Sequence, residues 1–176
     1  MNKLALALVL LAAPLAARAD IGVRLGGEAN IASHYGTVGT KVITDYWPLA
    51  GDVMVSYWTP GSFLSIDLEL SEQFYLSTPS GGSARIGTVL RPGVRVSPPI
   101  LPLYLRAALP INVESPNANS RETYDLRLGA GFTFPLVLFK IYVEADADFP
   151  LGGGTYPPGS KADWQLWLSG GLDFRF

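Results

Sequence analysis

The feature that most constrains this chain is an alternation of apolar and polar residues with a period of two. In the last thirteen residues, every second position is apolar or glycine, and the positions between are mostly polar. Such alternation is typical of β-strands, in which successive side chains point to opposite faces. The alternation recurs in eight segments of the chain. It is least regular in segment 51–59, because Met54 and Trp58 interrupt its polar face. The pattern predicts strands over 21–31, 51–59, 64–71, 85–96, 103–112, 124–134, 139–149 and 164–176.

The connections between the predicted strands alternate in length. Short turns fall at about 59–62, 97–99 and 135–137, whereas longer segments rich in Gly, Pro, Ser and Asn cover 32–50, 72–84, 114–122 and 150–163. An even number of strands, with short turns at one end and long loops at the other, is typical of outer-membrane barrels. The sequence therefore predicts an all-β fold, an eight-stranded antiparallel up-and-down transmembrane β-barrel. Pro92 and Pro110 lack a backbone donor, and each predicts a local bulge.

Charged residues on the predicted strands gather on the polar face. A Lys or Arg on the lipid-facing wall of such a barrel costs about 2–4 kcal/mol at mid-membrane. We therefore expect the polar face to line the interior and the apolar face to meet lipid. A soluble lipocalin-like barrel would have the opposite arrangement. The charges on the polar face are Arg24, Arg85, Arg91, Arg95, Arg106, Arg127, Lys140, Arg175, Glu28, Asp52, Asp67, Glu69, Asp125, Glu144, Asp146, Asp148 and Asp173.

Eight strands enclose only enough space for side chains to fill. The eight cations and nine anions on the polar face are expected to pair in that space, and all of them except Asp52 make up the predicted interior ion-pair network. Asp67 and Glu69 should meet the arginines of segment 85–96, and Arg127 should meet the acids of segment 139–149. We therefore expect a plugged lumen without a wide pore.

The last alternating segment ends on Phe174, Arg175 and Phe176. It resembles the closing strand of bacterial outer-membrane barrels, and 20–176 is similar in architecture to the small barrels of the OmpA and OmpX type. The resemblance implies that Phe174 and Phe176 form an insertion signal read by the barrel-assembly machinery. It also implies a Gram-negative outer-membrane protein, in contact with lipid and lipopolysaccharide, that serves envelope integrity, adhesion or surface interaction through its outer loops. We expect a monomer.

The N-terminal nineteen residues follow a different pattern. Lys3 precedes an apolar run over 4–13, and the triplet at 17–19 has the small residues of a cleavage site, so 1–19 is predicted to be a secretory signal peptide. The barrel domain is then 20–176, and its even strand number places both ends in the periplasm. Without Lys3 and Arg18, eleven basic residues face fifteen acidic ones, and this net charge of −4 argues against a nucleic-acid partner.

Three alternatives to a purely structural role remain open. Glu144, Asp146 and Asp148 share one strand face and could hold a hard cation such as calcium, although they are better explained as counter-ions for interior arginines. His34 beside Ser33 raises the possibility of a lipid A-modifying enzyme, but adjacent strand residues point to opposite faces and form no nucleophile-base pair. A narrow passage for small solutes is the third. We expect no catalytic residue, cofactor or metal.

Overall fold

The computed structural model describes residues 20–35, 39–42, 48–59, 62–76, 85–114, 125–151 and 163–176. No helix in these ranges is long and apolar enough to cross a membrane. The predicted signal peptide lies outside the described residues. The strands are β1 (Asp20–Tyr35), β2 (Gly39–Val42), β3 (Pro48–Trp58), β4 (Leu64–Tyr75), β5 (Arg85–Val96), β6 (Leu103–Ala108), β7 (Ile111–Glu114), β8 (Asp125–Pro135), β9 (Lys140–Pro150) and β10 (Trp164–Arg175).

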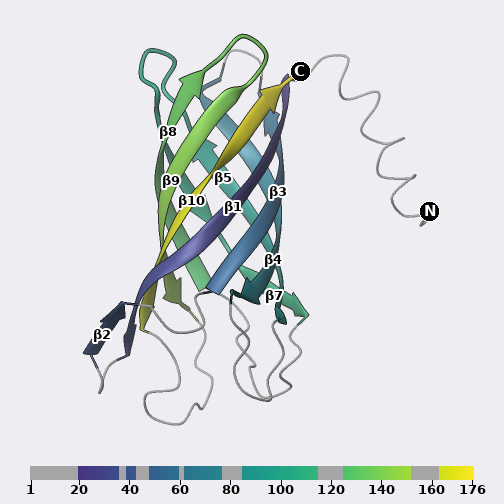
Figure 1. The fold of residues 1–176 in the computed structure, drawn as a ribbon. Helices are drawn as coiled ribbons and strands as arrows, with labels where there is room; N and C mark the ends of the chain where they lie inside the picture. Colours follow the sequence, from purple (N-terminus) through teal and green to yellow (C-terminus); the bar gives the residue numbers. More distant parts are fainter. Residues whose placement is uncertain are drawn as a thin grey trace, which may run out of the picture.

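The strands form one closed antiparallel barrel (Figure 1). Around the barrel the order is β1, β3, β4, β5, the β6 and β7 pair, β8, β9 and β10, and β10 then pairs with β1. β6 and β7 both pair with β5 and together occupy one strand position in the barrel wall, here called a stave. The barrel therefore has eight staves, and the predicted fold class is confirmed. Asp20, Phe176, the end of β3, the start of β4 and the turns at 97–102 and 136–139 lie at one end, here called the short-turn end. The opposite end is called the loop end.

Two prolines account for the break in the stave formed by β6 and β7. The predicted strand 103–112 is interrupted at Leu109 and Pro110, and Leu109 N–H donates to the carbonyl of Pro92 at 2.9 Å. Pro92 itself pairs with Leu68 in unbroken register, so the bulge predicted there is not observed. On its other side, Pro92 falls between the pairings of β5 with β6 and with β7. The two prolines, which have no backbone N–H to donate, therefore lie where the hydrogen-bond ladder is interrupted.

The segment predicted as a loop over 32–50 contains more strand than expected. β1 continues to Tyr35 and pairs there with the short strand β2, while β3 begins at Pro48. The pairing of β1 with β10 shifts register between Asn30 and Ala32. This irregularity ends the simple alternation at Ile31, and it explains why the sequence pattern did not predict the outer part of β1.

The barrel has an inverted polarity, with apolar residues outside and charged residues inside. On β4 the outward residues Ile66, Leu68 and Leu70 are at least half exposed, whereas the intervening Asp67 and Glu69 are buried. The same alternation holds along β3 and β9. A soluble barrel buries its apolar face instead. These strands therefore present apolar side chains to their surroundings.

Gly171 on β10 supplies a test of the closing seam. It lies opposite Gly26 of β1, and an added Cβ would overlap the backbone carbonyl of Leu25 and approach Gly26 Cα to 2.6 Å. Gly171→Ala should therefore destabilise the barrel by about 1–3 kcal/mol through overpacking, as measured by urea unfolding in lipid vesicles. Gly51→Ala is the matched control, because its Cβ would meet nothing within 4 Å. Equal effects of the two substitutions would contradict this account of the seam.

Candidate functional site

The lumen is lined by charged side chains that are buried. Because every second residue of a strand points inward, β1, β3, β4, β5, β6, β8 and β9 all contribute to this lining. Among the described residues the buried acids outnumber the buried arginines by two. The buried charged residues are Arg24, Arg91, Arg95, Arg106, Arg127, Glu28, Asp52, Asp67, Glu69, Glu144, Asp146 and Asp148.

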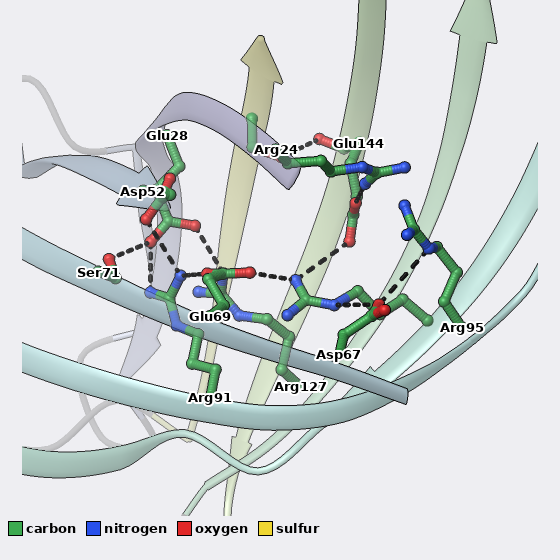
Figure 2. Close-up of polar contacts among 12 residues, drawn as sticks. Arg24, Glu28, Asp52, Asp67, Glu69, Ser71, Arg91, Arg95, Arg127 and Glu144 are labelled. Carbon is green, nitrogen blue, oxygen red and sulfur yellow. Dashed lines mark hydrogen bonds and ion pairs between the residues drawn. The ribbon is translucent and has the colours of Figure 1, made fainter. Parts of the chain in front are cut away.

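Glu28 lies at the centre of one cluster of ion pairs (Figure 2). One of its carboxylate oxygens accepts a hydrogen bond from Arg91, and the other lies 2.6 Å from Nη1 of Arg127. Arg127 also donates to both oxygens of Asp148, at 2.6 and 2.8 Å. Arg91 donates its other terminal nitrogen to Glu69. These are charge-assisted hydrogen bonds, which are about twice as strong as neutral ones.

Arg24 organises a second cluster nearer the short-turn end. Its Nε donates to Asp173 at 2.9 Å, and its Nη1 lies 3.2 Å from Glu144. The hydroxyl of Tyr104 donates to the same carboxylate at 2.7 Å. The guanidinium carbon of Arg24 lies 4.5 Å from the ring centre of Tyr104 and 4.4 Å from that of Tyr142. Cation–π contacts of this kind strengthen when they are desolvated, so the two rings help to compensate burial of the charge.

Several ion pairs join staves that are not adjacent in the sheet. Glu28 on β1 reaches Arg91 and Arg127, each three staves away. Arg95 on β5 lies 3.5 Å from Asp173 on β10, on the opposite side of the barrel. The sequence suggested pairs only between neighbouring strands. Two such neighbours, Arg91 with Glu69 and Arg127 with Asp148, do lie opposite each other in register.

Arg85 lies on the outer wall, not in the predicted interior network. Its side chain is 41% exposed and bonds Glu72 and Glu114, the latter at 2.9 Å. The pairing of β4 with β5 shifts between Gln73 and Phe74, so Ile86 is left out of the register and Arg85 pairs with Phe74. Because a β-bulge inserts one extra residue, the residues on its two sides no longer share the same inward and outward alternation. The bulge therefore turns Arg85 from the inward to the outward phase.

The other predicted network residues that are not fully buried lie at the two mouths. Lys140, Arg175 and Asp173 line a cavity at the short-turn end, and Arg175 pairs with Asp20 at 2.6 Å. Asp125 is half-buried and lines a cavity at the loop end. The structure therefore divides the predicted set into a buried core, two mouths and one group on the outer wall.

Three residues that contribute to the lumen are missing from the predicted network. Asp52 is buried with one carboxylate oxygen 3.5 Å from Arg91. Tyr104 and Tyr142 are also buried and pack against Arg24. Tyr104 lies two residues from Arg106, and Tyr142 lies two residues from both Lys140 and Glu144, so each tyrosine is on the same strand face as charged residues. That shared face is the sequence signal by which the two tyrosines could be found, whereas Asp52 is assigned to the polar face by its own charge.

The middle of the lumen is filled, while both mouths are open. The cavity bordered by the central ion pairs is about 10 Å³, room for about one water molecule. The short-turn end holds a cavity of about 450 Å³ and the loop end one of about 220 Å³. Two vestibules are therefore separated by a plug of paired side chains.

The acids of β9, considered for a metal site, and Ser33 with His34, considered for an enzyme, can now be located in the structure. No group of three or more potential metal ligands forms a metal site within the described ranges, including the acids of β9. Ser33 is buried and its hydroxyl lies 3.3 Å from Oδ1 of Asn30. His34 is partly exposed, stacks on Trp164 and has Nδ1 3.1 Å from Oδ2 of Asp163. Ser33 and His34 therefore face away from each other.

Arg127 tests the contribution of the buried pairs. Arg127→Met would leave Asp148 as a buried charge without its arginine and Glu28 with Arg91 as its remaining arginine, and we expect a loss of about 3–5 kcal/mol in the free energy of unfolding, measured with urea in vesicles. Arg85→Met removes the same type of side chain from an exposed cluster, where ion pairs contribute little, and should cost much less. A larger effect at Arg85 would show that the buried pairs do not dominate.

Comparisons with known proteins add no functional assignment to this geometry. The chain matches no protein-family model, no curated protein and no solved structure. The function is therefore argued from the barrel and its lumen.

Proposed function

We propose that the protein is a non-enzymatic barrel of the bacterial outer membrane, closed to solutes, that serves envelope integrity or surface interaction. The observation that supports this proposal is the inverted polarity of the strands. Leu25, Val53 and Leu70 lie side by side on three neighbouring staves and are 45–50% exposed, while the charges of the same strands are buried. Such a wall is suited to lipid, and closure satisfies the backbone groups that lipid cannot bond.

The proposed location rests on the chain's sequence signals together with the barrel. Residues 1–19 would direct export, and Phe174 and Phe176 would present the insertion signal to the barrel-assembly machinery. Backbone bonds between Phe176 and Ile21, at 2.9 and 3.3 Å, hold this end within the closing seam. Both ends of the barrel domain would face the periplasm. Lipid and lipopolysaccharide would surround the barrel, and interactions with other surfaces would fall to the connections at the loop end.

The filled lumen favours a structural role over the narrow solute channel. The two vestibules do not communicate through a cavity of appreciable size, because the space between them is about 10 Å³. The side chains that block it are held by hydrogen bonds from several directions, as Arg127 is by Glu28 and Asp148. Opening a path would separate buried charges from their partners, which is costly.

A charge placed on the wall tests whether it faces lipid. Val53 lies between Leu25 and Leu70 in register, and Val53→Lys should make folding into phosphatidylcholine vesicles less favourable by about 2–4 kcal/mol. Val137→Lys is the control, because Val137 is 99% exposed in a short turn. If Val53→Lys were as mild as Val137→Lys, the wall would be facing water, and the membrane proposal would fail.

Removal of an interior pair tests the plug. Arg106 Nη1 and Glu69 Oε2 are 2.5 Å apart beside the central cavity, so the double substitution Glu69→Ser with Arg106→Ser shortens both side chains at unchanged net charge. In planar bilayers we expect no stable conductance from the wild type and resolvable openings from this variant. The control is Glu72→Ser with Arg85→Ser on the outer wall, which should stay closed. A stable large conductance of the wild type would refute the plug.

A further inference from the structure

The vestibule at the short-turn end has the size and the lining of a ligand site. Its volume is about 450 Å³, within the range of about 300–1,000 Å³ that is usual for small-molecule pockets. Its lining combines the exposed apolar residues Phe63, Leu101 and Leu103 with the polar side chains of the barrel mouth. The pocket at the loop end is half as large, so the short-turn end is the better candidate.

Cations dominate the lining of this vestibule. Arg24, Arg95, Lys140 and Arg175 line it, and Asp173 is the single acid among its described lining residues. Arg24 and Arg95 both use Asp173 as a partner, at 2.9 and 3.5 Å. One carboxylate therefore serves two guanidiniums, and it is not free for other cations in the vestibule.

Lys140 is the cation with unused capacity. It lies opposite Asp173 in the pairing of β9 with β10, yet within the described part of the chain its ammonium has no ion pair or hydrogen bond. Among the described residues the one ion-pair partner of Arg175 is Asp20, which contacts a single terminal nitrogen, and the Arg175 side chain is 41% exposed. An ammonium and a partly used guanidinium at one pocket supply several donors for an incoming acid.

Trp58 provides a rigid apolar surface beside these cations. Its side chain is buried, and the guanidinium carbons of Arg95 and Arg175 lie 4.9 and 4.8 Å from its ring centre. The indole and the two cations thereby hold one another in place. An acid bound here would meet donors that are already oriented, with apolar turn residues beside them.

We propose that the vestibule binds a compact amphiphilic anion, that is, a carboxylate or phosphate group joined to a small aromatic or short apolar body. Lys140 and Arg175 bind the acidic group, and Phe63, Leu101 and Leu103 contact the apolar body. The ligand enters and leaves at the same mouth, because the filled mid-lumen gives it no way through. The site goes beyond the proposed structural role, and it does not depend on the orientation of the barrel in a membrane.

Calorimetric titration of the whole barrel domain in phosphatidylcholine nanodiscs tests the site. Benzoate and phenyl phosphate should each bind saturably at one site per barrel, and the affinity should fall as salt is raised. Inorganic phosphate and benzyl alcohol, which carry only one half of the proposed ligand each, should bind at least about tenfold more weakly. Empty nanodiscs supply the blank. Preference between benzoate and phenyl phosphate identifies the acidic group.

Variants connect the binding to the named residues. Lys140→Gln and Arg175→Gln should each weaken phenyl phosphate by about tenfold or more, since each removes a charge-assisted donor. Lys140→Arg should restore most of the affinity, and Arg85→Gln on the outer wall should leave it unchanged. Heat-modifiable gel mobility verifies that each variant is folded. Absence of saturable binding by both aromatic anions, or unchanged affinity in both Gln variants, overturns the proposal, and equal binding of inorganic phosphate overturns the amphiphilic ligand class.

Discussion

Closure of the sheet between β1 and β10 is the constraint on which the rest of the structure depends. The pairing runs from Gly22 and Arg175 to His34 and Trp164, with one register shift. It removes the two free edges that an open sheet would expose, and it fixes the small diameter of an eight-stranded barrel. At that diameter, side chains from opposite staves can touch. The ion pairs across the lumen therefore exist because the seam is closed.

The chemistry of the lumen follows from that narrow interior. A buried charge is tolerated only with partners in good geometry, and arginine, with five donors in a planar fork, can satisfy several acids at once. Arg127 bonds both Glu28 and Asp148, while Arg24 combines two carboxylates with two aromatic faces. The five guanidiniums that are buried within the described strands thus link strands that are distant in sequence. The same pairs fill the space through which a solute would pass.

The sequence predicted the fold because strand periodicity is local, and it predicted less of the site because the site is not. The alternation of odd and even positions along the strand was sufficient to predict that Asp67 and Glu69 point inward and that Leu68 points outward. The side chain of Arg85 points outward because of a bulge at Ile86, and the residues of β5 give no sequence signal for that bulge. The break between β6 and β7 falls at Leu109 and Pro110, where Leu109 N–H donates to the carbonyl of Pro92 on the neighbouring strand. Pairs such as Arg95 with Asp173 require the barrel diameter and register, which arise only when the chain closes.

The ties from Glu28 to distant staves have a consequence for the order of assembly. Glu28 belongs to the first strand, and its partners Arg91 and Arg127 belong to β5 and β8. In an incomplete sheet Arg91 could still reach Glu69 and Arg127 could still reach Asp148 across neighbouring strands, but the pairs that Glu28 makes across the lumen would form only when the last strand closes the barrel. The transition to the closed state should accordingly be steep, with partly built barrels sparsely populated. The ion pairs across the lumen therefore stabilise only a barrel whose first and last strands are paired in the correct register, and they disfavour closure in a wrong register.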